Sequence, residues 1–127
     1  MNRYYFDHNA TTPVSPEVLE AILPVFREDF GNASSIHYFG QAAKRHLDEA
    51  RARIAAMFGA NTDEIVFTSG GTEADNLAIF GTVRYNPRPR KHVITTAIEH
   101  PAVLGACAQL EREGVEVIFA YPGGASM

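Results

Sequence analysis

The sequence predicts an α/β fold with a mostly parallel sheet and flanking helices. In its second half, segments rich in strand-forming residues alternate with segments of helical periodicity, and the links between them are short. Short links of this kind imply right-handed crossovers, which set the strands parallel to one another. The length of 127 residues allows one modest domain, or part of a larger one, but not two.

Composition narrows the classes of protein that the chain can belong to. The apolar share of 46% and the charged share of 20% are ordinary for a soluble protein. A net charge of -4 provides no basic field that would attract nucleic acid, and no apolar run is long enough to span a membrane. We therefore expect neither nucleic acid nor a membrane as a partner. The first six residues do not resemble a signal peptide, which favours a cytoplasmic location. One cysteine, Cys107, permits no internal disulfide, and no Cys or His spacing indicates a metal site.

The chain opens with a short extended aromatic piece and a polar loop. Tyr4–Phe6 is the extended piece, and residues 7–13 are rich in turn-forming side chains. Ser15 then provides an N-cap and Pro16 a first-turn proline for a helix, which Pro24 should kink.

A second irregular stretch, residues 30–35, precedes the longest predicted helix. Apolar positions recur at helical spacing over residues 47–58, and Gly59 is the expected C-terminal stop. Glu49 and Arg53 stand four residues apart on the outer face, a pairing typical of a solvated surface.

The rest of the chain alternates between strands and helices. We expect strands over residues 64–68, 92–96 and 115–119, and helices over residues 72–83 and 101–113, the latter ended by Gly114. Ligands of open parallel sheets bind at the carboxyl ends of the strands, so the turns after Thr68 and Thr96 are the candidate sites.

The turn after Thr68 has the composition of a phosphate cradle. In Ser69–Glu73, two glycines let the backbone approach an anion, and Thr72 opens a helix whose N–H groups point outward. The alternative is a tight strand-to-helix turn in which Thr72 is the N-cap and Asp75 a weak capping-box partner. The string is neither a dinucleotide fingerprint nor a Walker loop.

The turn after Thr96 places His100 at a helix N-terminus, just before Pro101. There the helix dipole favours a neutral imidazole, which can stack on a ring or move a proton. The alternative is that His100 only caps the helix.

Four strings, in order, resemble motifs of the cysteine desulfurases, pyridoxal 5'-phosphate enzymes of the class V aminotransferase group. They cover most of the chain. The strings are Tyr5–Pro13, Phe30–His37, Ile65–Asn76 and Ile98–Val103. The resemblance implies that residues 1–127 are the incomplete amino-terminal part of the large domain of a fold-type I transferase.

The resemblance also assigns roles to residues. It implies that Gly71 and Thr72 hold the phosphate of pyridoxal 5'-phosphate through a backbone N–H and a hydroxyl. It makes His100 a catalytic residue, stacked on the pyridine ring and assisting proton transfer. Ala10 and Thr11, with Asn32, are implied near the substrate entrance, with less definite roles.

Several catalytic residues of the family are expected further downstream. These are the Schiff-base lysine, an aspartate facing the pyridinium nitrogen, an arginine for the substrate carboxylate and a nucleophilic loop cysteine. Neither lysine is placed to be the Schiff-base lysine, because Lys44 lies inside a helix and Lys91 at the amino edge of a strand. Cys107 lies on an apolar helix face, so we expect it to be buried and not to be the nucleophile. The ending Tyr121–Met127 departs from the family, so we expect a truncated, frameshifted or fragmentary chain that is inactive alone.

The resemblance implies that the complete protein takes sulfur from L-cysteine, leaving alanine and a persulfide. Sulfur-acceptor proteins in iron–sulfur cluster assembly or related pathways would receive it, and the complete enzyme would be a homodimer. Alternatives are another class V enzyme, such as a selenocysteine lyase or an aminotransferase-like relative, or a non-catalytic chain. Exposed strand edges and helix faces predict marginal stability or aggregation of the isolated chain.

Overall fold

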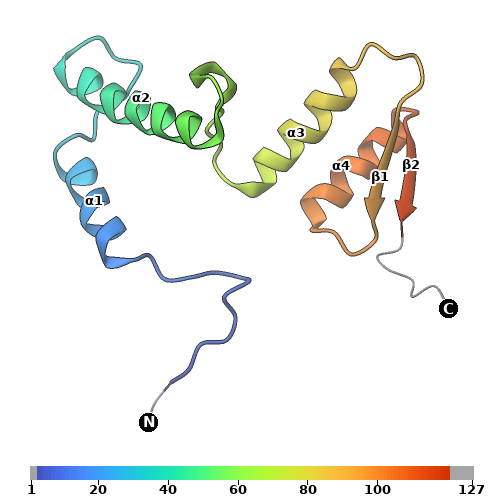
Figure 1. Cartoon of the computed structure of the whole chain (residues 1–127), viewed down its shortest axis with the longest axis horizontal. Coiled ribbons are helices and arrows are strands. Elements are labelled where there is room, and N and C mark those ends of the chain that lie inside the picture. The colour runs from blue at the N-terminus through green and yellow to red at the C-terminus, as the bar shows by residue number, and fades with distance from the viewer. Residues whose placement is uncertain (1–2, 121–127) are drawn as a thin grey trace. The chain divides into compact units, whose positions relative to one another are not determined.

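The computed structural model describes residues 3–120, which divide between Val66 and Phe67 into two compact units, a first of residues 3–66 and a second of residues 67–120 (Figure 1). The elements in chain order are α1 (Pro16–Arg27), α2 (Tyr38–Phe58), the short 3-10 helix η1 (Thr62–Glu64), α3 (Gly71–Tyr85), β1 (His92–Thr96), α4 (Pro101–Arg112) and β2 (Glu116–Ala120).

In the first unit, α1 begins as predicted. The Ser15 hydroxyl accepts a hydrogen bond from the Val18 N–H at 3.3 Å, and Pro16 is the first helical residue. The helix runs through Pro24 to Arg27, so the proline does not end it.

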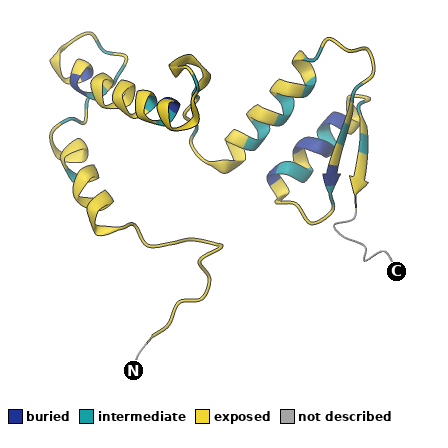
Figure 2. Cartoon of the chain, viewed as in Figure 1, coloured by how far each residue is buried: buried dark blue, intermediate teal, exposed yellow. Residues whose placement is uncertain are grey.

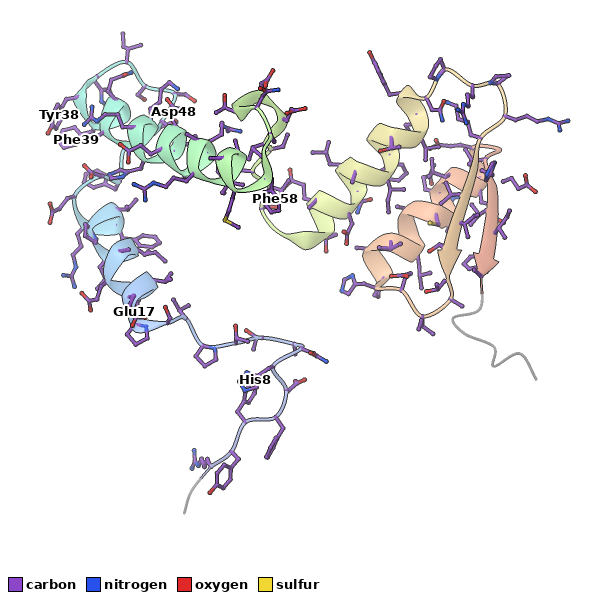
Figure 3. All side chains as sticks on the ribbon, viewed as in Figure 1. His8, Glu17, Tyr38, Phe39, Asp48 and Phe58 are labelled. Atoms are coloured by element: carbon purple, nitrogen blue, oxygen red, sulfur yellow. The ribbon has the colours of Figure 1, made fainter. Side chains whose placement is uncertain are left out.

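Helix α2 ends at the predicted glycine. Gly59 has φ 63°, a left-handed conformation that glycine adopts without steric cost, and its N–H turns back to the carbonyls of the last turn. The helix begins earlier than its apolar pattern, because His37 Nδ1 accepts the Gly40 N–H at 3.4 Å and caps it. Tyr38 and Phe39 therefore lie in its first turn and Phe58 in its last (Figure 3). The predicted Glu49–Arg53 pair forms at 3.8 Å on the exposed surface.

The second unit contains a two-stranded parallel sheet packed against α4. Val93 lies opposite Val117 and Ile94 opposite Ile118. The buried side chains of this unit come mainly from one stripe of α4 (Figure 2). They are Ala102, Ala106, Cys107 and Leu110, joined by Thr95 of β1. The parallel α/β arrangement and the burial of Cys107 are thus confirmed.

The predicted strand over residues 64–68 is wrong. Glu64 ends η1, and residues 65–68 pair with neither strand of the described sheet. The Ile65 N–H turns back to Thr62 O at 3.4 Å, and Ile65 O accepts from the Arg51 guanidinium. A β-rich composition does not form a strand unless a neighbouring strand supplies the hydrogen bonds.

The other boundaries agree with the prediction to within two residues. Gly114, the expected stop after α4, has φ 86°. Among the described residues, no helix combines the length and the apolar character needed to cross a membrane. The ending Tyr121–Met127 lies outside the described residues.

Candidate functional site

The two turns selected from the sequence lie at one end of the second unit. The loop between α3 and β1 reverses the direction of the chain. The N-terminus of α3 therefore lies at the end of the unit where β1 ends and α4 begins (Figure 1). Gly71 and Thr72 occupy the first turn of α3, and His100 immediately precedes α4. The three principal candidates therefore lie at the same end of the unit.

The turn at Gly70 and Gly71 has the properties of an anion cradle. A Cβ added at either glycine would meet nothing within 4 Å, so the space over the turn is open. The first backbone N–H to bond back from α3 is that of Ala74, to Gly70 O at 3.1 Å. The N–H groups of Gly71, Thr72 and Glu73 donate to no described residue, and they stand at the positive end of the helix dipole.

Thr72 is not the N-cap of α3. The helix starts at Gly71 with Gly70 as its cap, which removes the alternative in which Thr72 caps it with Asp75 as partner. The Thr72 side chain is exposed, and its hydroxyl forms no hydrogen bond within residues 3–120. Its carbonyl accepts from Asn76 Nδ2 at 2.7 Å. The hydroxyl is therefore available to a ligand beside the free N–H groups.

A clamp across the turn was not predicted from the sequence. One carboxylate oxygen of Glu73 accepts from the Ser69 hydroxyl at 2.6 Å and from the Ser69 N–H at 2.7 Å. The hydroxyl first, and then the N–H, hold the pKa of Glu73 below its ordinary value of 4.5. The ionised carboxylate is thus bonded to Ser69 and to none of the free N–H groups. The sequence signal for this clamp is a serine four residues before a glutamate, with two glycines between them.

His100 is the N-cap of α4, as one of the two alternatives from the sequence predicted. Its Nδ1 accepts the Ala102 N–H at 3.1 Å, so Nδ1 carries no proton and the neutral ring bears its hydrogen on Nε2. Within the described part of the chain, Nε2 has no hydrogen-bond partner. Capping thus fixes the tautomer and orients the ring while one nitrogen stays available. No hydrogen bond joins His100 to Thr72 among the described residues.

Ala10, Thr11 and Asn32 belong to the first unit, whereas the principal candidates belong to the second. The N–H groups of Ala10 and Thr11 bond to Asp7 O at 3.1 and 3.4 Å and form an exposed turn. Asn32 Oδ1 accepts the Ser34 N–H at 2.9 Å, which shapes its own loop. Their expected place near a substrate stays a prediction.

The loop around Asn32 is pressed against the start of α2. A Cβ added at Gly31 would come within 2.2 Å of Phe39 O, so the glycine is required by the close approach of two backbones. This gives the matching string Phe30–His37 a structural reason that is independent of any ligand.

The lysines lie where the sequence placed them. Lys44 is paired with Asp48 at 2.7 Å within α2. Lys91 precedes β1, and its Nζ donates to Arg84 O at 3.3 Å. It therefore sits at the amino end of the strand, opposite the end that leads to His100. Nowhere in residues 3–120 do three His, Cys, Asp or Glu side chains gather in a way that could hold a metal ion.

Comparison with protein families gives a match over residues 4–124 to the family described as aminotransferase class-V. IscS 1 of Bacillus subtilis (strain 168) is 53% identical over 119 residues, which are 94% of this chain and 31% of that protein. The cysteine desulfurase IscS of Rickettsia akari (strain Hartford) is 48% identical, over 91% of this chain and 28% of its own length.

Solved structures show the same relationship. The structure of SspA in complex with cysteine has a TM-score of 0.81 and 41% identity, covering 93% of this chain and 34% of that one. DndA of Streptomyces lividans has a TM-score of 0.76 and 44% identity, covering 94% of this chain and 34% of its own. The chain spans about a third of the length of these proteins.

Proposed function

Because the chain belongs to the aminotransferase class-V family, we propose that it is the amino-terminal portion of a pyridoxal 5'-phosphate-dependent cysteine desulfurase. The complete enzyme would convert L-cysteine to L-alanine and pass the sulfur on as a persulfide. The observation that carries the proposal is the edge of the second unit, where three free N–H groups and the Thr72 hydroxyl lie at the same end as His100.

The residues present fit the cofactor's phosphate. The Gly71 and Thr72 N–H groups, with the Thr72 hydroxyl, are donors at a helix N-terminus over open space, which suits a dianion. When bound, pyridoxal 5'-phosphate acts as an electron sink for amino-acid chemistry. His100, held by its cap bond, would present the ring face and the Nε2 hydrogen at this edge and take part in proton transfer.

The names of the relatives support the choice of substrate. A structure of similar fold holds cysteine, and a relative bears the name cysteine desulfurase, which supports L-cysteine as substrate. We infer that sulfur-acceptor proteins, in iron–sulfur cluster assembly or a related pathway, receive the persulfide in the cytoplasm. We also infer that the complete enzyme is a homodimer, with Ala10, Thr11 and Asn32 near its substrate entrance.

A chimera tests the function. Residues 1–120 would replace the corresponding part of Bacillus subtilis IscS 1, whose remaining length supplies the rest of the enzyme. We expect the purified chimera to carry pyridoxal 5'-phosphate and to form alanine from L-cysteine, with the persulfide sulfur released as sulfide when a thiol reductant is added. The native chain alone, treated with cofactor and borohydride, is expected to show no adduct at Lys44 or Lys91, because neither lies at the candidate edge.

The alternatives give different results. The residues that separate a selenocysteine lyase or an aminotransferase-like enzyme from a cysteine desulfurase are expected downstream of this chain, so reading the gene beyond codon 127 distinguishes these alternatives. A folded chimera with no cofactor at all contradicts the cradle and favours a non-catalytic chain. A stoichiometric adduct at either lysine of the native chain contradicts its assignment as a partial site.

A further inference from the structure

A second charged feature lies at the other end of the unit, in the loop from α3 to β1. Residues 86–92, here termed the basic loop, contain Arg88, Arg90, Lys91 and His92 and no acidic residue. The protein has a net charge of -4 and 11 Lys and Arg in 127 residues, so three of those cations in this short loop are a local concentration. The basic loop is remote from the cradle, because it meets β1 at its amino end.

The basic side chains face common hollows. Arg88, Arg90, Lys91 and His92 line a hollow of about 190 Å³ that has no acidic residue in its lining. Arg90, Lys91 and His92 also line an adjoining hollow of about 590 Å³, where Glu116 is the acidic residue. The two hollows share Arg90, Lys91 and His92, so they form one continuous surface in which basic residues outnumber acidic ones.

The loop is held in shape, but its arginines are not paired. Asn86 Oδ1 accepts the Arg88 N–H at 3.0 Å, and the Glu116 N–H donates to Lys91 O at 3.2 Å. Pro87 and Pro89 restrict the backbone between these anchors. In the described part of the chain, Arg88 and Arg90 form no ion pair, and the nearby Glu113 is already bound by Arg84. The backbone of a shaped loop loses little entropy on binding, and each free guanidinium can hold a carboxylate bidentately.

We propose that the basic loop docks an acidic segment of a partner protein. Charge complementarity selects the class of partner, because the surface offers Arg88, Arg90 and Lys91 against the single acidic residue Glu116. Its extent over two hollows favours a segment with several carboxylates over a single small anion. A nucleic acid would need a longer basic track, and the net negative charge of the chain opposes it. The proposal stands on this surface alone and does not depend on the desulfurase activity.

Fluorescence anisotropy tests the proposal with a labelled peptide in which glutamates alternate with glycines. We expect R88E/R90E to weaken binding about tenfold at low salt, and high salt to weaken binding to the native chain. R3E/R45E is the matched control: it changes the net charge equally at exposed arginines that form no ion pair among residues 3–120, and it is expected to bind almost as the native chain does. R88K/R90K keeps the charge and should stay within about threefold.

Other results overturn the proposal. They are absence of peptide binding by the native chain, equal weakening in both reversed variants, and tighter binding of a single-stranded oligonucleotide at the same loop. Competition by inorganic phosphate as effective as that of the peptide would assign the surface to a small anion instead. Far-UV circular dichroism checks that each variant keeps its helices, and R88Q/R90Q replaces R88E/R90E if charge reversal unfolds the chain.

Discussion

Arg84 of α3 and Glu113, at the end of α4, are joined by two hydrogen bonds, from Nη2 to Oε1 at 2.7 Å and from Nε to Oε2 at 3.2 Å. The same guanidinium lies 4.2 Å from the centre of the Phe80 ring. The pair therefore ties α3 to α4 in the unit that carries the candidate site.

This pair predicts an acid-side loss of stability. The Arg84 hydrogen bonds, followed by that of Gln109, hold the pKa of Glu113 below its ordinary value of 4.5. A carboxylate with a lowered folded-state pKa stabilises the fold above its unfolded value, and the contribution is lost as the pH falls through the folded value. We expect the thermal midpoint of the native chain to fall more than that of E113Q between about pH 7 and about pH 3. The effect is small because both side chains are partly exposed.

The neighbouring Glu111 provides the control for that measurement. It is exposed and forms no ion pair in residues 3–120, so E111Q should follow the native pH profile. An E113Q profile that is indistinguishable from the native one would show that the pair contributes nothing.

Thr72 is predicted to recognise the cofactor phosphate. In the chimera, T72V removes the hydroxyl beside the free N–H groups, and we expect affinity for pyridoxal 5'-phosphate to fall about tenfold. Affinity for pyridoxal, which lacks the phosphate, should barely change. Thr82→Val, in an exposed position on the same helix, is the control and should alter neither affinity. Equal losses for both ligands would mean that Thr72 acts on the fold and not on the phosphate.

His100 is predicted to have two separable roles. H100A removes the cap of α4 and should lower the free energy of unfolding of the native chain by about 1 kcal/mol. H100N can still cap the helix and should keep most of that stability, as measured by urea titration. In the chimera, both variants should lose desulfurase activity, since neither has an imidazole. If H100N retains full activity, the imidazole does not take part in the reaction.

Leu110 is predicted to be the most sensitive core position of the second unit. It is 0% exposed, and Leu110→Ala would leave a cavity between α4 and the sheet, lowering the free energy of unfolding by about 2–5 kcal/mol. The core is otherwise made of small side chains, so we expect urea titration to find the variant largely unfolded before denaturant is added. Leu77→Ala, at a residue that is 51% exposed, is the control and should cost far less.

Marginal stability of the isolated chain remains a prediction, with a physical basis in the sheet. Ile94 and Ile118 lie directly opposite each other and are 63% and 42% exposed, whereas the Val93–Val117 pair is half-buried. One face of the sheet is thus covered and the other is apolar and open. A sharp thermal transition of a monomer would contradict the prediction.

Local signals predicted most of the elements. Ser15 with Pro16, Gly59 and Gly114 mark helix ends through their own side chains or backbone freedom, and the structure confirms each. Strand β1 was predicted residue for residue from its β-branched run. These signals depend on a few neighbouring residues, which is why the sequence suffices for them.

Residues 64–68 show where such signals fail. Their composition is as strand-like as that of β1, but a strand exists only when another strand binds its N–H and C=O groups. Here the Ile65 carbonyl is bound by Arg51, a residue 14 positions away, which no local pattern reveals.

The sequence by itself determined the helix caps, the parallel strand pair and the family motifs, because each depends on residues or elements that are close together in the chain. Only the tertiary structure decided that Thr72 leaves its hydroxyl free, that Glu73 clamps Ser69, and that His100 bonds through Nδ1 and so keeps Nε2 available. It also decided that the basic side chains of residues 86–92 share hollows. These are relations between atoms set by how helices and strands begin and pack, and residue order does not encode them directly.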